Sequence, residues 1–134
     1  MAVYENKGFY RIEANKSKKR LYLNYFGHWE SPDQVSDYVV HVGKAVEELK
    51  EGGFSTLAQI EDTKPPKLAI NNIHKRAQQI QKDAGVQRVA IIIKPGQILQ
   101  KLTLSVVGRL SGLPQKVFTS INDAEAWLDA EMVK

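Results

Sequence analysis

The run from Val89 to Ile93 is apolar at every position and constrains the fold more than any other part of the chain. Successive side chains of a β-strand point to opposite faces of a sheet, so a strand of this composition has two apolar faces. Such strands are typical of sheets that are covered on both sides, as in α/β proteins. We therefore expect this strand to lie centrally in a sheet and to end at Pro95-Gly96.

The C-terminal segment changes from a strand pattern to a helix pattern with almost no loop. Val117 to Ile121 has the composition of a short strand. Asn122 follows as a predicted helix cap, with Glu125 completing a capping box. Such a direct passage from strand to helix is typical of small αβ domains. Three residues are expected to dock the helix: Ala124, Trp127 and Leu128.

Two strands joined by a turn are predicted near the N-terminus. They span Phe9 to Ala14 and Arg20 to Phe26, with the turn at Asn15 to Lys19. Both strands are rich in aromatic or aliphatic residues, which favour strands. Alternation along the second strand predicts one face of Leu21, Leu23 and Tyr25 and an opposite face of Tyr22 and Asn24.

The first predicted helix has clear start and stop residues. Ser31 can cap it, Pro32 suits the first helical position, and Gln34 can complete a capping box. Gly52-Gly53 ends it, because glycine readily adopts the left-handed conformation at a helix terminus. Apolar residues recur at three- and four-residue spacing and predict one buried stripe: Val35, Tyr38, Val39, Val42, Ala45, Val46 and Leu49.

A third strand and a second helix follow. The strand is predicted at Phe54 to Glu61, and the segment Lys64 to Lys67 turns the chain into the helix, which Gly85 ends. The predicted core face of this helix consists of Ile70, Ile73, Ala77, Ile80 and Ala84.

A further helix is predicted from Ile98 to Ser111, and its composition is unusual. Leu104 falls opposite its apolar stripe, while β-branched residues and Gly108 lower its helix propensity. This pattern indicates either a mobile or partner-contacting helix, or a helix packed on two sides within the domain. The candidate contact residues for a partner or ligand are Leu99, Leu102, Thr103, Leu104, Val106 and Val107.

Together these elements predict one α/β domain over residues 1–134, with a single mixed sheet of about five strands and four helices. A chain of 134 residues that is 43% hydrophobic suits one domain with a buried core. It has no cysteine, which excludes disulfides, thiolate metal sites and cysteine nucleophiles. It also lacks a signal-peptide pattern and an apolar run of the roughly 20 residues that span a bilayer. We therefore expect a soluble, cytoplasmic protein.

The net charge of +4 is mild, and part of it lies in the predicted N-terminal turn, at Lys16, Lys18, Lys19 and Arg20. A basic turn can contact phosphate or anionic lipid. The alternative is a solvated turn that protects a strand edge from aggregation. We prefer the solvated turn and expect no nucleic-acid partner, because no aromatic platform or nucleic-acid motif accompanies the charge.

No recognised catalytic or metal-binding motif is present. His28 lies in a predicted loop, and His41 and His74 lie on the rims of the helix stripes, without metal-ligand spacing to one another or to a carboxylate. Glu61 and Asp62 are adjacent in a predicted strand, so they point to opposite faces and form no acid/base pair unless the strand breaks. Phosphate-binding glycine patterns and the GxSxG nucleophile motif are absent. We expect no enzymatic activity, no cofactor and no metal.

The order of predicted elements and three local segments carry a family resemblance. The segments are Tyr25 to Trp29, Leu57 to Asp62, and Asn122 to Leu128. With them, nearly the whole chain resembles the SpoIIAA-like branch of the STAS superfamily, which contains the bacterial anti-sigma-factor antagonists. The resemblance implies a mixed sheet with helices largely on one face, and kinship in fold with the lipid-binding domain of Sec14-like proteins.

One departure from that family pattern concerns regulation. Phosphoregulated antagonists carry an Asp-Ser-Ser-Gly-like segment where the central strand meets the next helix, and this chain has Asp62-Thr63-Lys64-Pro65-Pro66 there. Thr63 is thus a candidate phospho-acceptor, with the role of an N-terminal helix cap as the preferred alternative.

Two functions follow as expectations. The first is a non-catalytic protein-interaction or regulatory domain that docks a protein partner or forms a homodimer. The second is binding of a lipid or other small apolar ligand, with peripheral membrane association and the helix at 98–111 as a lid.

Overall fold

The computed structural model describes residues 2–6, 8–26, 29, 31–60, 68–93 and 115–132. Six strands form one sheet: β1 (Ala2–Asn6), β2 (Tyr10–Asn15), β3 (Arg20–Tyr25), β4 (Phe54–Ile60), β5 (Val86–Ile92) and β6 (Gln115–Phe118). The helices are the 3-10 turn η1 (Pro32–Val35) and the α-helices α1 (Tyr38–Glu47), α2 (Leu68–Asp83) and α4 (Ile121–Met132).

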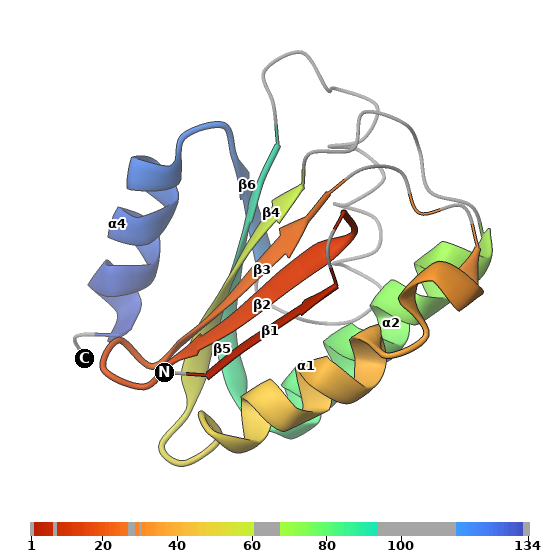
Figure 1. Ribbon diagram of the computed structural model, residues 1–134. Coiled ribbons are helices and arrows are strands. Elements are labelled where there is room, and N and C mark those ends of the chain that lie inside the picture. The colour runs from red at the N-terminus through yellow and green to blue at the C-terminus, as the bar shows by residue number, and fades with distance from the viewer. Residues whose placement is uncertain are drawn as a thin grey trace.

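The strands lie in the sheet in the order of the sequence, from β1 to β6 (Figure 1). The pairs β1–β2 and β2–β3 are antiparallel, and β3–β4, β4–β5 and β5–β6 are parallel. The N-terminal half of the sheet is therefore a meander. Its C-terminal half is built of parallel strands, with α1 connecting β3 to β4 and α2 connecting β4 to β5.

Helices cover both faces of this sheet. Figure 1 shows α1 and α2 side by side on one face and α4 on the other. Each face has its own core. The core under α1 and α2 contains Leu21, Leu23 and Ile91, whereas the core under α4 contains Leu57 and Ala90. The expected α/β class and mixed sheet are confirmed.

The predicted faces and stripes are confirmed where the structure describes them. Leu21, Leu23 and Tyr25 face α1 and α2, and Tyr22 packs in the α4 core. Every residue of the α1 stripe is buried or packed against the core, and so is every residue of the α2 core face. Strand β5 lies between two strands and is buried on both faces, since Ile91 and Ile92 belong to opposite cores.

The element counts need correction. The sheet has six strands rather than about five, because Ala2–Asn6 adds an edge strand that pairs with β2. Its short sequence, Ala-Val-Tyr-Glu-Asn, gives little apolar alternation, so its extended form depends on that pairing. The described residues contain three α-helices, and the predicted helix at 98–111 lies outside the described residues.

Two helix starts also differ from the prediction. Gln34 Oε1 accepts the Ser31 backbone N–H at 3.2 Å as expected, but a 3-10 turn precedes α1 and the continuous α-helix begins only at Tyr38. Such turns are common at helix N-termini. At the C-terminus, α4 begins at Ile121 with Ser120 as its cap, because Ser120 Oγ accepts the Asp123 N–H at 3.3 Å. Asn122 therefore lies within the helix.

Within the described segments, none of the helices combines the length and the apolar composition that crossing a membrane requires.

Replacing Ile92 by aspartate is expected to unfold the domain, because it would bury a carboxylate without a counter-charge in the α4 core. We expect the free energy of unfolding to fall by about 4 kcal/mol or more, measured by thermal or denaturant unfolding. Gln87→Asp changes an exposed position of the same strand and serves as the control. Equal stability of Ile92→Asp and the wild type would contradict the burial of β5 on both faces.

Candidate functional site

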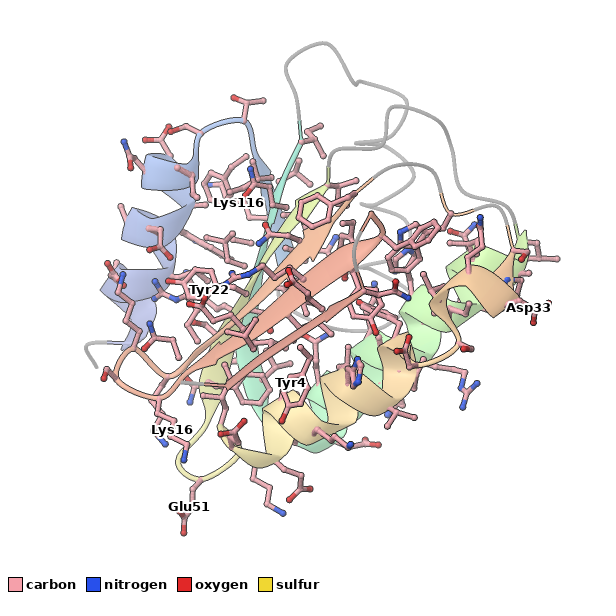
Figure 2. All side chains as sticks on the ribbon, in the orientation of Figure 1. Tyr4, Lys16, Tyr22, Asp33, Glu51 and Lys116 are labelled. Carbon is pink, nitrogen blue, oxygen red and sulfur yellow. The ribbon has the colours of Figure 1, made fainter. Side chains whose placement is uncertain are left out.

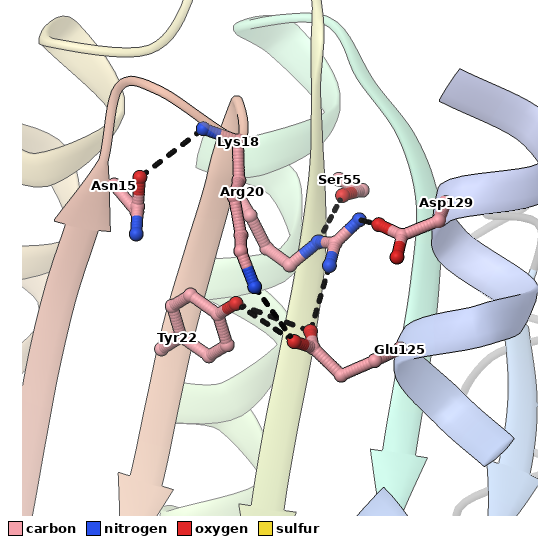
Figure 3. Close-up of polar contacts among 7 residues, drawn as sticks. All are labelled: Asn15, Lys18, Arg20, Tyr22, Ser55, Glu125 and Asp129. Carbon is pink, nitrogen blue, oxygen red and sulfur yellow. Dashed lines mark hydrogen bonds and ion pairs between the residues drawn. The ribbon is translucent and has the colours of Figure 1, made fainter. Parts of the chain in front are cut away.

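The structure gathers polar and aromatic side chains at two ends of the sheet. At the end where β3 begins, the guanidinium of Arg20 is fully buried and makes three contacts (Figure 3). Its Nη1 is 2.7 Å from Glu125 Oε1, its Nη2 is 2.7 Å from Asp129 Oδ1, and its Nε donates to Ser55 Oγ at 3.0 Å. We call the group formed by Lys18, Arg20, Tyr22, Ser55, Glu125 and Asp129 the α4 clamp.

Local structure explains how the α4 clamp forms. Arg20 is the first residue of β3, and Ser55 is its partner in the β3–β4 register. Glu125 and Asp129 are four residues apart and thus share one face of α4. Tyr22 and Lys18 add hydrogen bonds to Glu125, at 3.1 Å and 3.2 Å. The clamp therefore joins the hairpin, two strands and the C-terminal helix.

Electrostatics within the clamp favour ionised groups. Burial opposes ionisation of Glu125, but hydrogen bonds from Arg20 and Lys18 outweigh it, and the pKa of Glu125 lies below its ordinary value. Two cations, Lys18 and Arg20, face two carboxylates, so the charges balance. This arrangement holds α4 on the sheet, which is a structural role.

The predicted basic turn makes intramolecular contacts. Besides Lys18 with Glu125, Lys19 Nζ donates to the carbonyl of Glu51 at 2.7 Å, and Lys16 Nζ lies 3.9 Å from Glu48. Figure 2 shows Lys16 and Glu51 at the same end of the molecule. Lys16 and Lys18 thus face carboxylates, whereas Lys19 bonds to a backbone carbonyl.

An aromatic cluster, defined by Tyr10, Tyr25, Trp29, Tyr38 and His74, lies under α1 and α2. Trp29 and His74 are stacked with ring centroids 5.2 Å apart, and Trp29 donates its indole N–H to the Phe9 carbonyl at 2.9 Å. The hydroxyls of Tyr25 and Tyr38 are 2.6 Å apart. Neighbouring rings meet edge to face, an arrangement that stabilises aromatic pairs beyond their buried area.

Desolvation keeps the aromatic cluster neutral. Burial lowers the pKa of His74 to about 4, and it raises the pKa of Tyr25 to about 12. Neutral imidazole and neutral phenols are therefore the forms present near pH 7. His74, predicted to lie on the rim of the α2 stripe, is half-buried there, and its ring packs against Trp29, Tyr25 and Tyr38.

The aromatic cluster reaches the edge where parallel strands end. Tyr25 is the last residue of β3 and pairs with Ile60, the last residue of β4. In open α/β sheets, ligands bind outside the carboxyl ends of strands where the strand order reverses; the strands described here keep the order of the sequence. Helix α2 begins next along the chain with Leu68, whose side chain is 74% exposed, and η1 contacts α2 nearby.

Several predicted site residues lie outside the described residues. These are His28, Glu61, Asp62, Thr63 and the six candidate contact residues Leu99, Leu102, Thr103, Leu104, Val106 and Val107. Their predicted roles stay predictions. His41 is described, and its ring contacts Tyr10 and Tyr4.

The α4 clamp was missed by sequence reasoning, which assigned Glu125 to a capping box and Arg20 to a basic turn. The i,i+4 spacing of Glu125 and Asp129 could have indicated a site for a guanidinium, but the identity of that partner depends on tertiary structure. Across the described ranges, no group of three or more histidine or acidic side chains could hold a metal ion.

Comparisons with protein-family models, with curated proteins and with solved structures found no match to this chain.

Removing the charge of Glu125 should destabilise the domain, because Asp129 would then be the one counter-ion of buried Arg20 among the described residues, and that carboxylate is 61% exposed. We expect Glu125→Gln to lose about 2 kcal/mol of unfolding free energy and Asp129→Asn less than about 1 kcal/mol, measured by denaturant unfolding at pH 7. Because its folded pKa is lowered, the stability contribution of Glu125 should be complete above its unfolded pKa and be lost as the pH falls through the folded pKa. Equal losses of unfolding free energy in the two variants would contradict the larger contribution assigned to Glu125.

His74 should make the domain sensitive to mild acid. Its folded pKa of about 4 lies below the ordinary 6.5, so the unfolded chain takes up a proton first. The contribution is complete above pH 6.5 and declines towards pH 4, by up to about 3 kcal/mol. In His74→Phe, the unfolding free energy should vary much less between pH 6.5 and 4. Lys75→Gln changes an exposed neighbour and should retain the wild-type change of unfolding free energy with pH. The same change with pH in His74→Phe would contradict the assignment of the acid sensitivity to His74.

Proposed function

We propose that this chain is a non-catalytic protein-interaction domain of the STAS-like kind. The observation that carries the proposal is the sheet itself. An antiparallel meander continues into parallel strands β4, β5 and β6, with α1 and α2 together on one face. This arrangement agrees with the mixed sheet that the family resemblance implies, although α4 covers the second face.

The partner surface that we propose is the carboxyl edge of the parallel strands, where α2 begins. Leu68 has the largest exposed fraction, 74%, among the exposed large hydrophobic side chains of the described residues. The first turn of α2 lies beside η1, in which Pro32 and Asp33 are exposed. An apolar side chain with polar neighbours is a common anchor of protein interfaces.

The contacts of the described polar groups support binding rather than catalysis. Arg20 and Glu125 hold α4, and the hydroxyls of Tyr25 and Tyr38 bond to each other. The carboxylates and hydroxyls that are buried in this part of the chain thus serve intramolecular contacts. A protein whose exposed edge offers an apolar anchor can act by docking.

A test compares Leu68→Lys with Ala69→Lys, which alters the next exposed position of the same helix. The wild-type chain and each of the two variants are immobilised separately. Each is then used for quantitative affinity capture from an extract of the cells in which the protein occurs. A partner bound by the wild type should bind Leu68→Lys roughly tenfold more weakly and Ala69→Lys nearly unchanged. Thermal unfolding of both variants checks that the fold is intact.

The alternative function, binding of a lipid or small apolar ligand, predicts a different result. Native mass spectrometry of the purified chain would then show a stoichiometric lipid adduct. Such an adduct, together with equal capture by both variants, would replace the interaction proposal with the carrier function.

A further inference from the structure

Two hydrogen bonds meet at the buried hydroxyl of Tyr10. The hydroxyl donates to Asp37 Oδ1 at 2.9 Å, and it lies 2.7 Å from His41 Nδ1. Tyr10 belongs to β2, whereas Asp37 is the residue before the first turn of α1 and His41 lies one turn into that helix. Tyr4 of β1 stacks on the imidazole with ring centroids 5.2 Å apart and thus restricts its orientation.

The number of protons fixes the direction of these bonds. A phenol has a single proton, and an ionised carboxylate can only accept. The Tyr10 proton therefore points to Asp37, so the bond with His41 must be donated by Nδ1–H. Neutral His41 is thereby held as the Nδ1–H tautomer, which leaves the lone pair on Nε2. The histidine side chain is 22% exposed, so it is open to solvent in part.

This arrangement resembles the way in which an acid orients a catalytic histidine through hydrogen bonding. We infer that Nε2 of His41 is a nucleophile that accepts a phosphoryl group from a phosphoramidate donor. In the reaction, the Nε2 lone pair forms a bond to phosphorus, and the bond from phosphorus to the donor's leaving group breaks. The leaving group keeps that electron pair, while Nδ1 retains its proton throughout.

Charges around His41 suit such a reaction. Attack by Nε2 places positive charge on the ring, and Asp37 Oδ2 lies 3.9 Å from Nδ1, where it stabilises that charge. Lys44 follows one helical turn later on α1 and is exposed, so its ammonium can approach the incoming phosphoryl oxygens. Glu48, which accepts the Tyr4 hydroxyl at 3.5 Å, is opposed by Lys16 at 3.9 Å.

His74 is an internal comparison. Its ring is packed among Trp29, Tyr25 and Tyr38, and burial lowers its pKa to about 4. Its nitrogens have no hydrogen-bond partner within the described segments. A weakly basic imidazole that packs against three aromatic rings should react slowly. The inference about His41 does not rest on the proposed partner function.

The tautomer is tested first, by nitrogen-15 NMR of the imidazoles of the whole chain at pH 8. His41 should show a protonated Nδ1 and a bare Nε2. Tyr10→Phe keeps the ring but removes the bridging hydroxyl, so the Nε2–H form should then appear. Asp37→Asn keeps an acceptor oxygen, and the Nδ1–H form should persist. A wild-type His41 in the Nε2–H form would overturn the inference.

Reactivity is tested with phosphoramidate, in which the P–N bond breaks and ammonia leaves. A His28→Gln background leaves His41 and His74 as the two histidines that report. An acid-labile phosphoryl group should form on His41 faster than on His74, followed by phosphorus-31 NMR and peptide mass spectrometry. Tyr10→Phe and Asp37→Asn should each slow labelling of His41 by roughly five- to tenfold.

The control for reactivity is Tyr22→Phe, which removes a hydroxyl from the opposite face of the sheet and should leave the rate unchanged. Because Asp37 is 49% exposed, Asp37→Asn gives an informative rate even if Tyr10→Phe fails to fold. Equal labelling of His41 and His74, or an unchanged rate in Asp37→Asn, would overturn the inference.

Discussion

The buried guanidinium of Arg20 is the constraint on which the covering of one sheet face by α4 depends. A guanidinium stays charged at any ordinary pH, so its burial is tolerable only with counter-ions and hydrogen bonds in place. Ser55 supplies one bond from the neighbouring strand, but both carboxylates come from α4. The position of α4 over β4, β5 and β6 is thereby coupled to the first residue of β3. Leu57 and Ala90 are covered as a consequence.

The two helical layers are held by different interactions. On the α1 and α2 face, neutral aromatic rings pack edge to face or stacked. The hydroxyls of Tyr25 and Tyr38 bond to each other, and Trp29 bonds to the backbone. On the α4 face, ionic bonds to Arg20 flank a small apolar core, and Arg88 lies over the Trp127 ring at 4.4 Å. Aromatic packing is insensitive to salt, whereas the exposed ion pair that Lys18 forms with Glu125 is screened by it. The layers therefore respond to different changes of solvent.

Sequence periodicity predicted the parts of the fold that depend on local pattern. The α1 stripe, the α2 core face and β5 were found because burial repeats with the period of the element. Strand β1 and the cap at Ser120 were missed because neither follows from periodicity: β1 depends on pairing with β2, and Ser120 lay within the strand predicted from Val117 to Ile121. Arg20 was predicted to be solvated since its carboxylate partners are more than a hundred residues away. Contacts at that separation leave no trace in a local window.

The sequential order of the strands has a consequence for synthesis. Each strand pairs with the one made just before it, so the sheet can grow in the order in which the ribosome releases the chain. Arg20 is made more than a hundred residues before Glu125 and Asp129. Until α4 is made, the nascent sheet carries a cation that lacks both of the carboxylates described here as its partners. A chain that stops before α4 thus exposes both an apolar face and a charge without these two counter-ions.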